Sequence, residues 1–170
     1  MPTRSLERTA PLVLHREPVQ RAWIDYNDHL NMAYYMLIFD HGTDALFDHL
    51  GLGWDHVRED GGTTFTLEAH ITYLREVALD DVVRIETRIL DFDEKRIHYV
   101  HAMFHDREGY LAAVNELMTL HVDLASRRTA PMPDSALALL AGYKAAHAGL
   151  ARPEGMSRTM GLHNRRKRSG

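Results

Sequence analysis

The sequence contains no cysteine among its 170 residues. This absence excludes disulfide bonds, thiolate nucleophiles and cysteine-based metal sites. A covalent mechanism would have to use a carboxylate or a hydroxyl group. Acid–base chemistry would rest on carboxylates and on imidazoles, of which the twelve histidines offer many.

Long apolar runs and an excess of positive charge are also missing. No stretch of about 18 apolar residues occurs, and residues 1–11 lack the apolar core of a signal peptide. We therefore expect a cytoplasmic protein without membrane association. The net charge of −4 argues against a general nucleic-acid role. Positive charge gathers in a C-terminal tail, residues 149–170, which we expect to be irregular.

Motifs for nucleotides and metals are absent as well. Neither G-x-x-x-x-G-K-[ST] nor G-x-G-x-x-G occurs, and we expect no cofactor. The densest group of histidines is His98, His101 and His105. Strand alternation places His98 on the face opposite the other two, so we expect no metal site.

The composition, with 45% apolar and 26% charged residues, fits one globular domain, which we assign to residues 12–148. Hydrophobic periodicity predicts strands in residues 12–22, 63–75, 82–90, 96–105 and 110–124, a long helix in 32–50, and a short helix in 134–146. Pro18 indicates that the first strand lies at an edge of the sheet or contains a bulge. The predicted fold class is α+β, with one long helix wrapped by a curved antiparallel sheet of about five strands.

Such a sheet leaves one face and its edges to be covered. We expect Ile97, Tyr99, His101 and Met103 to point outward from their strand with moderate apolar character. This surface predicts a homodimer or homotetramer, formed edge to edge or face to face.

Polar side chains that could take part in catalysis are concentrated in residues 23–35. Asp25, Asn27 and His29 alternate through a polar turn, and Asn31 stands where a helix N-cap would be. A helix N-terminus offers free N–H groups and partial positive charge, which stabilise a developing oxyanion. This combination suits acyl transfer. The alternative is a simple turn with an N-cap, since Asp, Asn and His are common turn residues.

In this order of elements, the stretch resembles the hotdog-fold thioesterases of the 4-hydroxybenzoyl-CoA thioesterase type. Many members read D-x-x-G-H-V-N-N-A-x-Y, and the chain matches at Asp25, His29, Asn31, Ala33 and Tyr35. It departs by having Asp28 for Gly and Met32 for the second Asn. The chain is also similar to plant acyl-carrier-protein thioesterases, whose D-x-N-x-H-V-N pattern and Arg-Glu pair correspond to residues 25–31 and to Arg75 and Glu76.

The resemblance implies oligomers with active sites near the helix N-terminus at subunit interfaces. Asp25 would be the nucleophile or the general base, supported by Asn27 and His29. The candidate substrate-binding residues are Asn31, Met32, Tyr34, Arg75, Glu76 and Glu116. Glu116 interrupts an apolar strand face. It would either line the acyl pocket, or pair with a cationic acyl group, or lie at a solvent-exposed strand end.

The expected function is hydrolysis of a small or medium acyl-CoA. Residues 25–31, 43–45 and 121–123 resemble the thioesterases of bacterial carnitine breakdown, which act on betainyl-CoA. For such a substrate, an aromatic cage could hold the trimethylammonium group, although aromatic residues near a helix are more often core. The candidate cage residues are Trp23, Tyr26, Tyr34, Phe39 and Trp54. The alternatives are a hotdog hydratase or dehydratase and a non-catalytic acyl-CoA-binding module.

Overall fold

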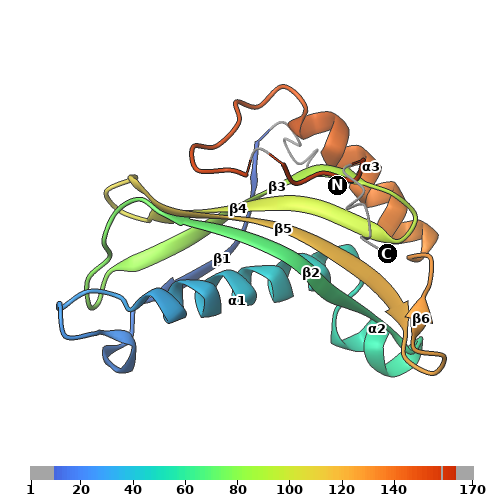
Figure 1. Ribbon diagram of the computed structural model, residues 1–170, viewed down its shortest axis with the longest axis horizontal. Helices are drawn as coiled ribbons and strands as arrows, with labels where there is room; N and C mark the ends of the chain where they lie inside the picture. The colour runs from blue at the N-terminus through green and yellow to red at the C-terminus, as the bar shows by residue number, and fades with distance from the viewer. Residues whose placement is uncertain (1–9, 158, 164–170) are drawn as a thin grey trace, which may run out of the picture.

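A curved antiparallel sheet surrounds one long helix in the structure, a computed structural model that describes residues 10–157 and 159–163. In chain order, the elements are β1 (Leu12–Pro18), η1 (Arg21–Trp23), α1 (Met32–Leu50), α2 (Trp54–Glu59), β2 (Gly62–Tyr73), β3 (Val82–Phe92), β4 (Arg96–His105), β5 (Leu111–Asp123), β6 (Arg128–Thr129) and α3 (Asp134–His147). The strand order is β1-β3-β4-β5-β2, with β6 paired to β5. Helix α1 lies along the concave face, and α3 packs beside the end of β3, where its Tyr143 contacts His49 of α1 (Figure 1). The predicted hotdog architecture is confirmed.

Helix α1 begins and ends where the sequence predicts. The Asn31 side chain accepts a hydrogen bond from the Ala33 N–H, and Gly51 ends the helix at φ 74°. The helix buries seven residues along its length: Tyr35, Ile38, Phe39, Gly42, Thr43, Leu46 and Leu50. The apolar face therefore packs against the sheet and fixes the position of the helix N-terminus.

Strand β4 corrects the prediction that Ile97, Tyr99, His101 and Met103 point outward. All four are fully buried, and they lie on the face that α1 covers. His101 shows this directly, because its Nε2 lies 3.0 Å from the Thr43 hydroxyl of α1. Alternation separates the two faces of a strand but does not say which one is inside. His98 does lie on the opposite face from His101, where it pairs with Glu116.

A buried polar network fastens α1 to the middle of the sheet. His101 lies between the hydroxyls of Thr43 and Thr87, at 3.0 and 2.8 Å, and Thr43 also contacts the Tyr99 hydroxyl at 3.3 Å. Burial, aided by nearby His15, lowers the pKa of His101 to about 3. The imidazole is therefore neutral at physiological pH, and both ring nitrogens have hydroxyl partners.

Three further features differ from the sequence prediction. Helix α2 was missed because its six residues are too few to show helical periodicity. The two-residue β6 was missed as well. The predicted C-terminal helix is confirmed, with the bounds Asp134–His147. The first strand ends at Pro18 and not at residue 22, and it is an edge strand, as the proline suggested; its bulge lies farther back, between Val13 and His15.

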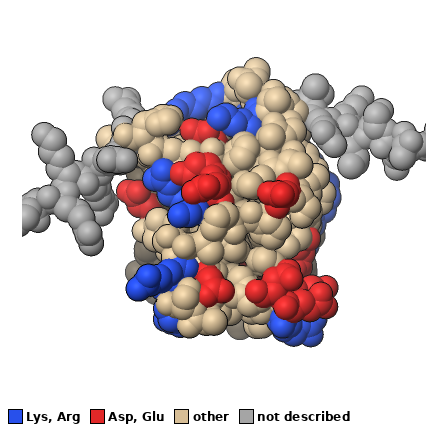
Figure 2. Space-filling model, turned by 90° about the vertical axis from the view of Figure 1, so that its right-hand side faces the viewer, with Lys and Arg blue, Asp and Glu red and all other residues tan. Residues whose placement is uncertain are grey.

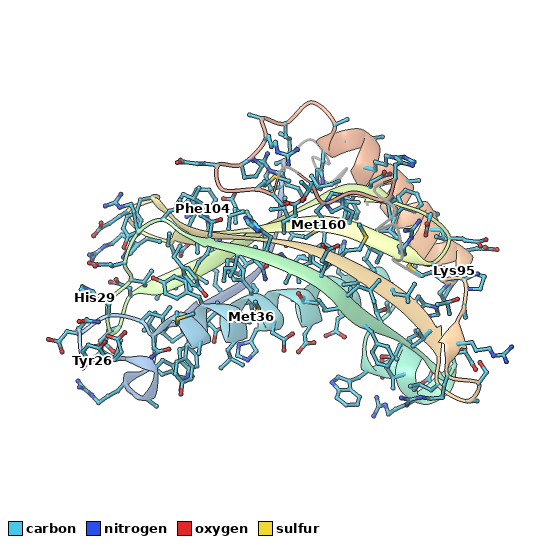
Figure 3. All side chains as sticks on the ribbon, in the orientation of Figure 1. Tyr26, His29, Met36, Lys95, Phe104 and Met160 are labelled. Carbon is cyan, nitrogen blue, oxygen red and sulfur yellow. The ribbon has the colours of Figure 1, made fainter. Side chains whose placement is uncertain are left out.

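The described part of the expected irregular tail crosses the sheet face opposite α1. It has no helix or strand, but Thr72 donates to the Gly155 carbonyl at 2.8 Å and the Ser157 N–H donates to Glu116 at 2.6 Å. Figure 3 places Met160 over this face. Residue 158 and the basic stretch 164–170 lie outside the described residues.

The surface at the α2 end carries both signs of charge. Acidic and basic side chains alternate over this face of the molecule (Figure 2). Within the described residues, no helix combines the length and the apolar character that a membrane span requires.

Gly62 gives a test of packing at this end. A β-carbon there would collide with the Nε2 atoms of His56 and His121, at 2.7 Å from the latter, whereas at Gly149 it would meet nothing within 4 Å. Gly62→Ala should therefore lower the free energy of unfolding by about 2 kcal/mol, as overpacking does. Urea denaturation measures this change. The matched Gly149→Ala variant should be nearly neutral, and equal effects from the two would contradict the packing at Gly62.

Candidate active site

A tight turn brings the polar residues of the 25–31 segment together. The Asp25 N–H donates to the His29 carbonyl at 3.0 Å, and the Asp28 N–H donates to the Asp25 carbonyl at 3.1 Å. Asp28 adopts φ 60°, in the left-handed region that glycine favours and aspartate tolerates. It occupies the position where the resembling thioesterases carry glycine, so the departure keeps the same kind of turn.

Backbone pairing joins this turn to the segment that follows β2. The Leu30 N–H donates to the Val77 carbonyl at 2.8 Å, and His29 forms a β-bridge with Ala78. The Asn31 N–H donates to the Trp23 carbonyl at 2.9 Å. The turn, the start of α1 and residues 74–78 therefore form one unit, which lies at the left in Figure 3 with Tyr26 and His29 labelled.

Asp25 is held with one oxygen engaged. Its Oδ1 accepts the Asn27 N–H at 2.8 Å, and no side chain or backbone group among the described residues binds the second oxygen. The carboxylate faces a cavity of about 670 Å³. The cavity is lined by Asp25, Asn27, His29, Leu30, Met32, Tyr35, Tyr73, Leu74, Arg75 and Glu76.

The start of α1 offers one free amide to this cavity. The Ala33 N–H is used by the Asn31 side chain, and the Tyr34 N–H donates to the Asn31 carbonyl at 2.9 Å. The Met32 N–H has no partner in the described part of the chain. It is thus the helix-start donor left for a ligand oxygen.

The opposite wall comes from the end of β2 and the residues after it. His29 Nε2 lies 3.1 Å from Glu76 Oε2, and the Arg75 guanidinium lies 3.8 Å from the centre of the Tyr110 ring. The Tyr35 hydroxyl donates to the Arg75 carbonyl at 3.2 Å. Burial raises the pKa of Tyr35 to about 12, so this hydroxyl keeps its proton at physiological pH.

Six of the predicted site residues line the same cavity: Asp25, Asn27, His29, Met32, Arg75 and Glu76. Asn31 adjoins it as the helix cap. Tyr34 does not line it, and packs instead against the Trp23 ring. Sequence reasoning missed Leu30, Tyr35, Tyr73 and Leu74 as lining residues. Leu30 and Tyr35 lie within the compared motif, and the other two directly precede the Arg-Glu pair, so the signal was present.

Glu116 corrects another expectation. It is fully buried on the sheet face opposite α1, with its oxygens 2.8 Å from His98 Nε2 and 2.6 Å from the Ser157 N–H. The Glu116 side chain is therefore a structural partner there and does not line the cavity. Period-two alternation could not show this, because both faces of β5 are buried.

The aromatic cage considered from the sequence is also not formed. Trp23 and Phe39 belong to the buried core, and Tyr26 is 95% exposed. Trp54 is 73% exposed and lines a different groove. Within the described residues, no group of three or more histidine and acidic side chains suited to a metal ion lies in the Asp25 cavity.

Comparison with known proteins identifies the family to which this chain belongs. A family model described as the thioesterase-like superfamily matches residues 19–140. The betainyl-CoA thioesterase of Pseudomonas aeruginosa is 40% identical over 151 residues, which cover 89% of this chain and 95% of that protein. An L-carnitine dehydrogenase/betainyl-CoA thioesterase of Rhizobium meliloti is 34% identical over 94% of this chain, which corresponds to 32% of that larger protein.

Solved structures agree. A Staphylococcus aureus protein determined in complex with CoA has a TM-score of 0.81 and 29% identity, covering 90% of this chain and 97% of that one. A thioesterase described as putative, from Pseudomonas putida, has a TM-score of 0.75 and 40% identity, covering 89% and 97%. By sequence, fold and the residues around Asp25, this chain belongs to the thioesterase-like superfamily and is a thioester hydrolase of the hotdog fold.

Proposed function

We propose that this chain hydrolyses acyl-CoA thioesters at Asp25, within a single domain of residues 12–148. One observation carries the proposal: a carboxylate with an unengaged oxygen shares a cavity with the start of α1, where the Met32 N–H lacks a partner. A base or nucleophile and an oxyanion donor are the two groups that thioester hydrolysis requires.

The reaction can follow two routes from this arrangement. As general base, Asp25 takes a proton from water while the hydroxyl attacks the thioester carbonyl carbon. As nucleophile, Asp25 attacks the carbon itself and forms an anhydride that water then opens. In both routes the carbonyl oxygen becomes an oxyanion that accepts from Met32 N–H, and the C–S bond breaks to release coenzyme A, which takes up a proton.

His29 and Asn27 position these groups. The Asn27 N–H fixes the Asp25 carboxylate, and Glu76 holds the His29 ring at the cavity wall. Arg75 is exposed at the rim, where its guanidinium would meet the phosphates of coenzyme A. The S. aureus relative determined in complex with CoA supports this class of substrate.

The exposed edge of the sheet favours a homodimer. Strand β2 ends the strand order and has no neighbour on its outer side. Exposed apolar side chains cover β2 and the adjoining face of α1: Met32, Met36, Leu37, Phe65, Leu67 and Tyr73. An unpaired edge beside an apolar surface is suited to antiparallel pairing with a second copy.

Self-pairing of β2 would join two different cavities. Antiparallel pairing over the whole strand sets Gly62 of one copy opposite Tyr73 of the other. Tyr73 borders the Asp25 cavity, whereas Thr63, Thr64 and Thr66 border a second groove of about 300 Å³ between α1, α2 and β2. The groove of one copy would therefore extend the catalytic cavity of the other.

This second groove is acidic and aromatic. Asp40, Asp44 and Asp48 are spaced one turn apart along α1, and Phe47 and the exposed Trp54 lie beside them. Burial raises the pKa of Asp44, and repulsion from the other two carboxylates adds to the shift. A bound cation would relieve this repulsion and could stack on the indole. We therefore propose a cationic acyl group, and the betainyl-CoA thioesterase of P. aeruginosa supports betainyl-CoA.

Asp25→Asn tests the catalytic assignment. The variant removes the base or nucleophile but keeps an oxygen for the Asn27 N–H, so hydrolysis should fall about 1,000-fold with the fold intact. Release of coenzyme A, followed with a thiol reagent, measures the rate. Asp28→Asn is the matched control, because asparagine also tolerates φ 60°, and it should stay within about twofold. Unchanged turnover in Asp25→Asn would refute the assignment.

Leu67→Glu tests the interface. Leu67 is 56% exposed near the middle of β2, and the proposed pairing sets it opposite Glu68 of the other copy, so a carboxylate at position 67 would face a second carboxylate. We expect sedimentation equilibrium to show that the variant is a monomer. Its rate of thioester hydrolysis should also be reduced. Val13→Glu, on the opposite edge strand with 38% exposure, should leave the dimer intact. A stable dimer in Leu67→Glu would place the interface elsewhere.

Substrate charge tests the acidic groove. Betainyl-CoA and 3,3-dimethylbutyryl-CoA have the same shape, but only the former is cationic. Asp44→Asn and Trp54→Leu should each lower the preference in kcat/KM for the cation about tenfold, the value of a partly buried cation contact. Asp55→Asn, on an exposed aspartate outside the groove, is the control. An equal loss of kcat/KM on both substrates would mean that the groove does not distinguish substrates by their charge.

A further inference from the structure

Three side chains away from the Asp25 cavity converge on one point. His15 and Glu17 lie on the same face of β1, two residues apart, and His41 approaches from α1. His15 Nε2 and His41 Nδ1 each lie 2.7 Å from the same oxygen, Glu17 Oε1. The three ligand atoms all lie within 4.8 Å of one another.

A cation bound at this point would balance the charge of the Glu17 carboxylate. The Glu17 side chain is only 12% exposed, and its ion-pair partners within the described residues are the two imidazoles; the neighbouring Arg16 pairs with Asp106 instead. Imidazoles in their neutral form leave the carboxylate charge unbalanced. Asp40 adjoins His41 in the sequence, and Asp44 interacts with His41 electrostatically, which makes the surroundings more negative still.

We infer that His15, Glu17 and His41 form a binding site for a divalent transition-metal ion, with Zn²⁺ as the best match. Two imidazole nitrogens and one carboxylate oxygen are a ligand set that zinc uses, at about 2.0–2.2 Å. Ligand atoms of a tetrahedral site then lie roughly 3.3 Å apart. The separations of 2.7 Å need to open only slightly for an ion to replace the shared hydrogens. His41 is 36% exposed, so water can reach the fourth position.

The ion would join the edge strand β1 to α1 and would not take part in hydrolysis. His41 lies nine residues beyond Met32 on α1, which corresponds to about 13 Å along the helix axis. Binding would stabilise the folded chain in proportion to the free ion concentration. The inference is therefore independent of the proposed reaction.

Calorimetric titration of tag-free, chelator-treated protein with ZnCl₂ tests the site. We expect one ion per chain and a rise in Tm with zinc concentration. Glu17→Gln and His41→Gln should each weaken the affinity about 100-fold, as loss of one of three ligands implies. His163→Gln is the control, because His163 is an exposed histidine outside the cluster.

Cobalt identifies the ligands by a second readout. Co²⁺ bound by the wild-type chain should give visible absorption typical of a tetrahedral site, and Glu17→Gln should abolish it. Zinc binding that is equal in wild type and both ligand variants would assign it to other histidines. That result, or no binding to the wild-type chain below millimolar zinc, would overturn the inference.

Discussion

The hydrogen bond from the Leu30 N–H to the Val77 carbonyl is the constraint on which the site depends. With the bridge between His29 and Ala78, it fixes the turn before α1 against the segment after β2. Asp25 and the helix start come from one side of this contact, and Arg75 and Glu76 from the other. Without it, the cavity would have no second wall and His29 would lose its carboxylate partner.

The burial of α1 makes that contact rigid. The helix packs its apolar face into the curve of the sheet, and the neutral His101 ties its middle to β3 and β4 through two hydroxyls. A helix held at mid-length and at its N-cap presents its first amide in a fixed direction. Electrostatic stabilisation of an oxyanion depends on such preorganisation, because a donor that must first reorient loses much of its effect. The core of the fold and the chemistry of the site therefore rest on the same packing.

Local sequence patterns were sufficient to predict most of the candidate site and much of the fold. The ends of α1 could be predicted because the capping residues, Asn31 and Gly51, act through contacts close in sequence. Strand alternation correctly placed His98 and His101 on opposite faces of β4. The turn at Asp25 was visible because polar residues cluster there. Glu116 and the inner face of β4 were misassigned because burial depends on what covers each face of the sheet. The C-terminal segment around Ser157, which donates a hydrogen bond to Glu116, is far from it in sequence, and no local pattern predicts that contact.

The central claim is that a thioester carbonyl binds between Asp25 and the first amide of α1. A crystal structure of the Asp25→Asn protein with a bound acyl-CoA tests it most directly. The account predicts the carbonyl oxygen about 3 Å from the Met32 nitrogen, with its carbon facing residue 25. A thioester bound with its carbonyl away from the start of α1 would contradict it.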